Sequence, residues 1–235
     1  MHSLVLAAML SAPVAANAAS VSCTLPGTIE PIHDDLPNDK TPARRLPIAS
    51  YTLALSWSPQ FCRGQGDKQS FQCNSGNRFG MTLHGLWPDG AGKDWPQYCK
   101  SVELISEAQI RRNLCLTPSA QLNQHEYAKH GSCMGVTPAQ YFDQSRALYQ
   151  AINFPDFDRM SRRPLTVGQF KDAFARANRG RIPVNAIRVT VTGGRWLDEL
   201  WLCLDTRYKF RRCAANQDGG VPNSRKLMIW RGGAG

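Results

Sequence analysis

Hydrophobic residues alternate with small or polar residues in the stretch YTLALSW, residues 51–57. A period of two is typical of a β-strand that buries one face. Residues 79–87 form a second predicted strand, and residues 184–192, 196–204 and 208–213 give three more. The predicted strands therefore fall into one group near the N-terminal end and one near the C-terminal end.

Helices are predicted between the two groups of strands. Thr137 and Pro138 mark the beginning of one, because threonine caps helix N-termini and proline suits the first helical position. The helices do not alternate with the strands, so the pattern predicts an α+β fold, with a central, mainly antiparallel sheet and several helices packed on it. The predicted helices cover residues 102–112, 122–130, 137–152 and 166–178.

The N-terminal residues 1–18 have the pattern of a secretory signal peptide. Their apolar run, residues 4–16, is too short to span a bilayer, and Ala16-Asn17-Ala18 fits a small-x-small cleavage site. A buried N-terminal helix is the alternative. Residues 19–47 carry five prolines and predict an irregular N-terminal arm, and residues 48–235 are expected to form one domain. We therefore expect a secreted or periplasmic protein without a transmembrane segment.

The chain contains eight cysteines. In an exported protein this number predicts up to four disulfides that staple the fold, although eight cysteines allow 105 different pairings. Metal binding is the alternative use of cysteine. It fits poorly, because the cysteines are scattered and no C-x-x-C pair is present.

The formal net charge is +10, and the sequence pI is about 9.4. Such an excess of positive charge attracts polyanions such as nucleic acids, and the attraction weakens as salt rises. Solubility or a general affinity for the cell envelope is the alternative explanation. The arginines gather in residues 111–112, 159–163, 176–181 and 207–212.

Two short segments hold three of the five histidines. One reads His84-Gly-Leu-Trp-Pro-Asp, and the other reads His125-Glu-Tyr-Ala-Lys-His-Gly-Ser-Cys. Histidine titrates near neutral pH, so two histidines from separate segments suit a reaction that needs one proton acceptor and one proton donor. Because Glu126 and His130 are four residues apart on a predicted helix, we expect them to share a face.

A zinc site is the main rival for the second segment. The zinc-binding pattern H-E-x-x-H places two histidines four residues apart on one helix face. Here His125 and His130 are five apart, so their rings diverge by about 140°. Lys129 lies between them and would repel a divalent ion. We therefore expect chemistry without a metal or other cofactor.

The two segments together resemble the paired motifs of the ribonuclease T2 family, H-G-L-W-P and H-E-W-x-K-H-G-x-C, with Tyr127 in place of the commoner tryptophan. The resemblance extends from about residue 51 to residue 213 and is greatest to bacterial periplasmic ribonuclease I. It implies a metal-independent endoribonuclease of low base specificity. Such an enzyme cleaves RNA through 2',3'-cyclic phosphates to 3'-phosphate ends and does not cleave DNA. We also expect a monomer.

The resemblance also implies a role for each motif residue. It makes His130 the general base and His84 the general acid, with the two exchanging roles when the cyclic phosphate is hydrolysed. Glu126 either supports His130 or hydrogen-bonds a phosphoryl oxygen, and Lys129 faces the phosphate charge. It also makes His125 a phosphate ligand and places Trp87 and Asp89 in a base pocket. For Trp87, packing in the hydrophobic core is the alternative.

The same resemblance implies disulfides between Cys99 and Cys133 and between Cys203 and Cys213. Cys62 and Cys73 are close enough in sequence for a local pair, which leaves Cys23 and Cys115 for each other. Two other functions stay open. One is a catalytically weak, basic RNA- or envelope-binding protein with the same fold, and the other is a toxin with the same chemistry.

Overall fold

The computed structural model describes residues 22–65, 70–215 and 219–232. The expected signal peptide, residues 1–18, lies outside this part of the chain. Four antiparallel strands form the central sheet in the order β2-β1-β5-β4. This arrangement confirms the predicted α+β class. The sheet strands are β1 (Ser50–Trp57), β2 (Met81–Asp89), β4 (Ile187–Thr192) and β5 (Trp196–Leu204).

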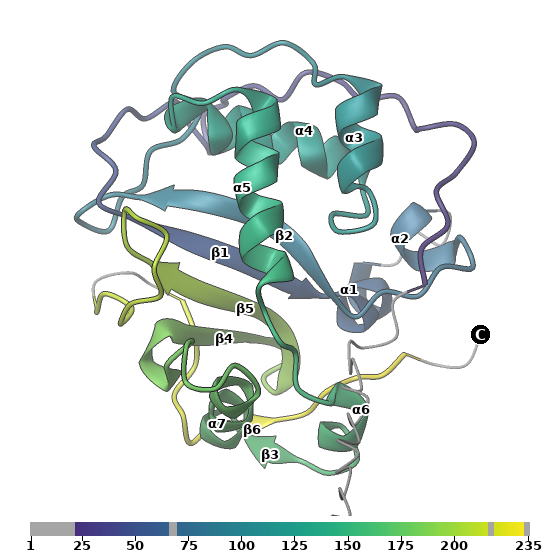
Figure 1. Cartoon of the computed structure of the whole chain (residues 1–235), viewed down its shortest axis with the longest axis vertical. Helices are drawn as coiled ribbons and strands as arrows, with labels where there is room; N and C mark the ends of the chain where they lie inside the picture. The colour runs from purple at the N-terminus through teal and green to yellow at the C-terminus, as the bar shows by residue number, and fades with distance from the viewer. Residues whose placement is uncertain (1–21, 66–69, 216–218, 233–235) are drawn as a thin grey trace, which may run out of the picture.

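Helices surround this sheet at its edges and on one face (Figure 1). Helix α5 crosses β2 and β1, α3 and α4 lie beyond the β2 edge, and α7 lies beyond β4 beside the small pair formed by β3 and β6. The helices are α1 (Ser58–Gln65), α2 (Phe71–Asn74), α3 (Glu107–Asn113), α4 (Ala120–Lys129), α5 (Pro138–Gln150), α6 (Phe157–Met160), α7 (Val167–Ala177) and the 3-10 turns η1 (Gly131–Cys133) and η2 (Val184–Ala186); β3 is Leu165–Thr166 and β6 is Lys226–Leu227.

The alternation in β1 divides its side chains between two faces. Leu53 and Leu55 are fully buried in the hydrophobic core on the face that α5 covers. The hydroxyl of Tyr141 in α5 contacts both the backbone N–H and the carbonyl of Leu86, which anchors this helix on β2. The opposite face of β1 carries small side chains, Thr52 and Ser56 among them, and leaves room for the site described below.

An irregularity in β2 brings His84 onto that open face. Ala54 pairs with Gly85 and Leu55 pairs with Leu83, so His84 is an extra residue without a partner on β1. In a regular strand His84 and Trp87, three residues apart, would point to opposite faces. The bulge shifts the alternation by one residue, and the rings of His84 and Trp87 consequently lie 5.1 Å apart.

The N-terminal arm makes specific contacts with the domain. The guanidinium of Arg111 donates to the carbonyls of Pro26 and Gly27, and Ser22 pairs with Arg78 through their backbones. The structure contains the same four disulfides that the sequence was expected to form: Cys23–Cys115, Cys62–Cys73, Cys99–Cys133 and Cys203–Cys213. The first of these attaches the beginning of the arm to the loop after α3.

Two expectations about the elements were wrong. Residues 208–213 do not form a strand, because the chain turns at Tyr208, whose φ is 60°, and only Leu204 and Phe210 form an isolated bridge. The helix expected over residues 102–112 begins later, at Glu107, because the side chain of Ser106 caps it by accepting from the N–H of Gln109. In the part of the chain that the structure describes, no helix has the length and apolar character needed to cross a bilayer.

Candidate active site

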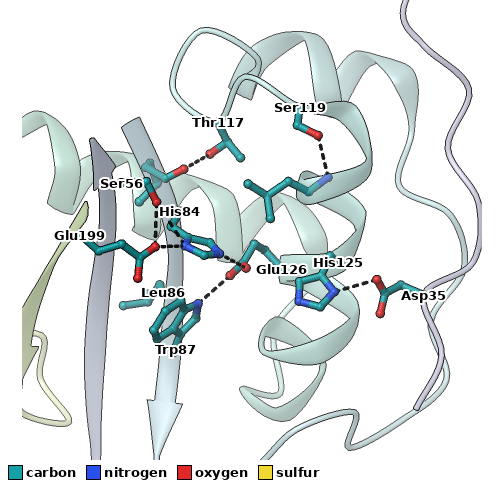
Figure 2. A network of polar contacts seen from close by, with 12 residues as sticks. Asp35, Ser56, His84, Leu86, Trp87, Thr117, Ser119, His125, Glu126 and Glu199 are labelled. Carbon is teal, nitrogen blue, oxygen red and sulfur yellow. Dashed lines mark hydrogen bonds and ion pairs between the residues drawn. The ribbon is translucent and has the colours of Figure 1, made fainter. Parts of the chain in front are cut away.

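His84 lies between two carboxylates (Figure 2). Its Nδ1 is 2.6 Å from Oε1 of Glu199 in β5, and its Nε2 is 3.4 Å from Oε1 of Glu126 in α4. The imidazole remains 28% exposed, whereas Glu126 is almost completely buried. Nδ1 therefore faces β5 and Nε2 faces α4.

Gly85 allows Glu126 to approach the sheet closely. A Cβ at this position would lie 1.7 Å from Oε2 of Glu126, so any side chain would displace the carboxylate. The same oxygen accepts a hydrogen bond of 2.8 Å from Nε1 of Trp87. This contact holds both the indole and the carboxylate beside the ring of His84.

His130 comes from the end of α4. The side chain of Ser119 caps the beginning of this helix, and His130 is the C-terminal cap, with its N–H bonded to the carbonyl of Glu126. The imidazole is buried, with 5% of the residue exposed, and stacks on Trp87 at a centroid distance of 5.4 Å. His84 and His130 thus contact the same indole, His84 edge-on and His130 by stacking.

The expectation that Glu126 supports His130 directly is not what the side chains show. Glu126 bonds to Trp87 and pairs with His84, and Nδ1 of His130 is buried without a hydrogen-bond partner among the described residues. Both side chains instead contact the indole of Trp87, Glu126 through a hydrogen bond and His130 by stacking. The four-residue spacing therefore gives the two residues a common neighbour.

Opposite electrostatic environments surround the two histidines. Burial would lower the pKa of His84, but the carboxylates of Glu199 and Glu126 raise it above its ordinary value despite the nearby Lys129. Burial lowers the pKa of His130 well below its ordinary value, and Lys129 and His125 add to this effect. The site therefore favours a protonated His84 and a neutral His130 at the same pH.

The two carboxylates also differ. Burial raises the pKa of Glu126, an effect that the neighbouring histidines and the Trp87 N–H only partly offset. Burial acts in the same direction on Glu199, but the hydrogen bonds from His84, Trp201 and Ser56 outweigh it and lower the pKa of Glu199. Glu199 is consequently the more firmly ionised of the two.

His125 receives a partner from the N-terminal arm. Its Nδ1 is 2.7 Å from Oδ2 of Asp35, as Figure 2 shows, and the other oxygen of Asp35 accepts a 2.6 Å bond from the hydroxyl of Tyr98. The ring centroids of His125 and His130 are 6.4 Å apart. His125 therefore belongs to the same cluster, and an arm that was expected to be irregular helps to fix it.

A cavity of about 400 Å³ opens beside the histidines. Trp87 and Asp89, both expected in a base pocket, line it, and Asp89 accepts a 2.9 Å bond from the hydroxyl of Thr52. The other lining residues are Gly90, Gly92, Lys93, Asp94, Trp95, Lys129, His130, Arg188, Trp201 and Gly219. The cavity thus combines aromatic faces, one carboxylate acceptor from β2 and several cationic side chains.

The four arginine clusters of the sequence do not line this cavity. Arg111 instead binds Glu107 and the N-terminal arm, and the guanidinium of Arg181 donates to the carbonyl of Ala151. The cationic residues of the cavity wall are Lys93, Lys129 and Arg188. Of these, only Lys129 was singled out from the sequence.

One disulfide fixes the turn that follows His130. Cys133 in η1 bonds to Cys99, and the N–H of Cys99 donates to the hydroxyl of Ser132. The neighbouring Tyr98 adopts φ 48°, a left-handed conformation that is uncommon for a bulky residue, and its N–H donates to the carbonyl of Lys129. The end of α4 is therefore attached to the segment that follows β2 by a covalent bond and two hydrogen bonds.

Several residues of the site were missed from the sequence. Glu199 had a detectable signal, since it is a charged residue within the otherwise apolar strand 196–204. Asp35 had none, because nothing in a proline-rich arm indicates which acid reaches the site. Trp201 was not considered, although it lines the cavity and its N–H donates to Glu199. Trp95 also lines the cavity, with 44% of the residue exposed.

No group of three or more histidine, cysteine, aspartate or glutamate side chains arranged to hold a metal ion occurs in residues 22–65, 70–215 and 219–232. The ionisable groups that do gather are the ones expected from the two motifs: His84, His125, Glu126, Lys129 and His130. Their arrangement suits proton transfer beside an anionic group, because Lys129 and His130 line the cavity and His84 packs against Trp87 in its wall.

Comparisons with known proteins agree with this geometry. The sequence model of the Ribonuclease T2 family matches residues 48–213. A "Probable ribonuclease" of Haemophilus influenzae is 30% identical over 188 residues, which is 72% of this chain and 62% of that protein. Ribonuclease I of Escherichia coli is 27% identical over 188 residues, covering 61% of this chain and 69% of its own length. The chain therefore spans somewhat less than two thirds of the first relative.

Solved structures show the same fold. An RNase-related protein from Calystegia sepium superimposes with a TM-score of 0.62 at 21% identity, over 77% of this chain and 96% of that chain. RNase NT, solved in complex with 5'-AMP, gives a TM-score of 0.61 at 18% identity, over 78% of this chain and 98% of that chain. At this level of identity the likeness establishes the shared fold alone.

Proposed function

The chain belongs to the ribonuclease T2 family, and from that premise we propose that it is a metal-independent endoribonuclease that cleaves RNA by transphosphorylation. One observation carries the proposal. His130 lines the cavity, His84 contacts the cavity-lining indole of Trp87, and the pKa values of the two histidines are shifted in opposite directions from the ordinary histidine value. Such a pair supplies one proton donor and one proton acceptor at the same pH.

The first step uses the RNA's own 2'-oxygen as the nucleophile. His130, neutral because it is buried among cations, takes the 2'-OH proton while the 2'-oxygen bonds to phosphorus. His84 gives its proton to the 5'-oxygen as the P–O5' bond breaks, which releases one RNA fragment and leaves a 2',3'-cyclic phosphate. The histidines then exchange roles, and water opens the cyclic phosphate to a 3'-phosphate.

The remaining ionisable groups act on the phosphate. Lys129 faces the cavity and supplies positive charge to the oxygens of the pentacovalent phosphorus. His125, fixed by Asp35, binds the phosphate from the neighbouring side. Glu126, held beside His84 and Trp87, is the group that we assign to a hydrogen bond with a phosphoryl oxygen.

Base binding is assigned to the aromatic part of the cavity. The indole of Trp87 offers a stacking face, and Asp89 offers an acceptor for an exocyclic amino group. Trp95 and Trp201 add further aromatic surface on the same wall. Stacking is tolerant of sequence, which fits low base specificity. The +10 charge attracts RNA over long range without reading its sequence.

The cellular setting completes the proposal. We infer that residues 1–18 direct export, that residues 19–47 form the arm of the mature protein, and that residues 48–235 form a single catalytic domain acting as a monomer in the periplasm or outside the cell. Four disulfides among the described residues fit an oxidising compartment. The relative in Escherichia coli is a ribonuclease I.

The decisive test is incubation of the purified protein with RNA in the presence of a chelator, followed by identification of the product ends. We expect undiminished cleavage, with 2',3'-cyclic phosphates first and 3'-phosphates later. Activity that needs a divalent metal and leaves 5'-phosphate ends would contradict the proposal. A catalytically weak RNA-binding protein would bind the RNA and leave it intact.

A further inference from the structure

We propose that Glu199 is a positioning residue for His84, which holds Nδ1 of the imidazole so that Nε2 carries the proton delivered to the 5'-oxygen. This inference rests on the proposed function and extends it to a residue outside both histidine segments. Glu199 lies in β5, 115 residues after His84 in the sequence. Its carboxylate does not line the cavity, and its shortest contact is with Nδ1 of His84, so we expect it to act through the histidine.

The carboxylate of Glu199 has donors on both oxygens, and Figure 2 shows those on Oε1, His84 and Ser56. Oε1 is 2.6 Å from Nδ1 of His84 and accepts a 2.8 Å bond from the hydroxyl of Ser56. Oε2 accepts a 2.8 Å bond from Nε1 of Trp201. An ionised carboxylate has no proton to donate, so Nδ1 of His84 must carry the hydrogen of their shared bond. The remaining nitrogen, Nε2, is then the one free to gain and lose a proton.

The sheet places this pair through two irregularities. His84 is the extra residue of β2 opposite β1. On the other side of the sheet, Val189 pairs with Leu200 and Val191 pairs with Leu197, so two residues of β5, including Glu199, lie opposite one residue of β4. The N–H of Glu199 donates to the hydroxyl of Thr190 at this point. Bulges commonly re-aim side chains at functional sites, and here each bulge supplies one member of the pair.

Charges from every neighbouring element act on His84. Glu199 and Asp198 come from β5, and Glu126 and Lys129 come from α4. The pKa of His130, at the end of α4, is lowered by burial, which favours its neutral form. Glu126 lies 3.4 Å from Nε2, the nitrogen that must deliver the proton, whereas Glu199 lies 2.6 Å from Nδ1. Glu199 is therefore the carboxylate that can keep its contact with the imidazole while Nε2 donates to the 5'-oxygen.

This arrangement fixes the direction of proton transfer in the first step. With Nδ1–H held by Glu199, the imidazolium releases the Nε2 proton to the 5'-oxygen, which takes the electron pair of the breaking P–O5' bond. The imidazole that remains is neutral and keeps its Nδ1 hydrogen. In the second step the same Nε2 accepts a proton from the attacking water, and the cycle returns to the imidazolium.

The test compares Glu199→Gln with the wild-type enzyme and with Glu103→Gln. The first change keeps the shape of the side chain and removes its charge, whereas the control removes a charge from an exposed loop residue. The pKa of His84 is measured by histidine NMR titration, and kcat/KM for a dinucleotide is measured against pH. We expect Glu199→Gln to lower the pKa of His84 and to move the basic limb of the kcat/KM profile to lower pH, each by about one to two pH units. The acidic limb and the Glu103→Gln profile should not move.

A second substrate separates positioning from a merely structural role. An aryl ester such as uridine 3'-(4-nitrophenyl phosphate) has a leaving group that needs little protonation. Glu199→Gln should therefore slow dinucleotide cleavage about 10²-fold or more while slowing aryl ester cleavage only a few-fold. Glu199→Asp, which keeps the charge, should shift the basic limb less than Glu199→Gln and covers the case in which the glutamine variant does not fold.

Different results would contradict the role of Glu199 and the proposed ribonuclease activity. If the wild-type enzyme cleaves RNA, but the His84 titration and the basic limb stay in place in Glu199→Gln, the assignment of Glu199 is wrong. An equal loss on both substrates with an unmoved basic limb would likewise show a structural role. If the wild-type enzyme does not cleave RNA at all, the proposed function itself fails, while the NMR titration still reports whether Glu199 controls the protonation of His84.

Discussion

Asp35 and His125 join the N-terminal arm to the helix that carries the second histidine segment. Oδ2 of Asp35 is 2.7 Å from Nδ1 of His125, and Oδ1 accepts from the hydroxyl of Tyr98. Tyr98 in turn donates its N–H to the carbonyl of Lys129. A residue that precedes the sheet thus contacts the histidine that is proposed to bind phosphate.

Replacing Asp35 by asparagine should weaken substrate binding more than it slows the chemical step. The imidazole of His125 would lose the carboxylate that fixes its orientation, which typically costs about 1–2 kcal/mol for a charge-assisted bond. We expect KM for RNA to rise about ten-fold, with kcat changed less. Asp34→Asn, an exposed neighbour on the same arm, is the matched control. Equal kinetics for the two variants would show that the arm contact has no catalytic role.

Substituting Gly85 by alanine should disrupt the site without introducing any new chemical group. The added Cβ would lie 1.7 Å from Oε2 of Glu126, so the carboxylate must leave Trp87. We expect a loss of about 1–3 kcal/mol in the free energy of unfolding and a larger loss of activity. Gly27→Ala, where nothing lies within 4 Å of the added carbon, controls for the general effect of the change. A fully active Gly85→Ala enzyme would show that the position of Glu126 is unimportant.

His130 should make the stability of the protein depend on pH. Burial lowers the pKa of its imidazole, so below about pH 6.5 the unfolded chain binds a proton that the folded protein does not. The resulting contribution to the free energy of unfolding is present above the unfolded-state pKa and is lost as the pH falls toward the folded-state pKa. Urea denaturation between about pH 7 and about pH 5 should therefore show a smaller decrease for His130→Gln than for the wild type.

The same variant should lose nearly all RNA cleavage, because removing one proton-transfer group typically costs about 10²–10⁴-fold. His33→Gln changes an exposed histidine of the arm and is the control for both measurements. An unchanged pH dependence of stability in His130→Gln would mean that His130 titrates normally. Full activity in a folded His130→Gln enzyme would remove this residue from the reaction.

The disulfide between Cys99 and Cys133 should matter more for activity than the one between Cys203 and Cys213. Their sequence separations are 34 and 10 residues, so the loop-entropy relation gives roughly 4 and 3 kcal/mol of stabilisation. Only the Cys99–Cys133 disulfide attaches the turn that follows His130 to the segment after β2. The paired Cys→Ser variants should both lower the urea midpoint, and we expect the Cys99/Cys133 variant also to lower kcat. Similar kcat values for the two would contradict this role.

The main elements of the fold could be predicted because their patterns are local. The alternation of residues 51–57 and the Thr137–Pro138 start are visible in short windows, and both elements are present. The strand expected at residues 208–213 was wrong because β-propensity could not anticipate the turn at Tyr208, which the backbone adopts with a positive φ. Local composition does not determine how a segment returns along a neighbouring strand.

The sequence pointed to the histidine-segment residues of the candidate site, but not to their contacts or to the other residues around them. The motifs identified His84, Glu126 and His130, but regular alternation would have put His84 and Trp87 on opposite faces of β2. The bulge that brings them onto the same face depends on how β2 pairs with β1. The pattern of residues along the chain does not specify that pairing. Glu199 and Asp35 reach the histidines from distant parts of the chain, so only the tertiary structure could reveal them.

The central claim is that the nucleophile is the 2'-oxygen of the RNA, activated by His130 and opposed by His84. It is tested most directly with two short RNAs that differ only in the sugar 5' to one defined phosphate, which carries either a 2'-hydroxyl or a 2'-O-methyl group. The protein is incubated with each in the presence of a chelator, and every cleavage position is mapped. We predict that the 2'-O-methyl group abolishes cleavage at that phosphate alone, while the neighbouring phosphates are still cut to 2',3'-cyclic ends. Cleavage at the blocked phosphate would contradict the account.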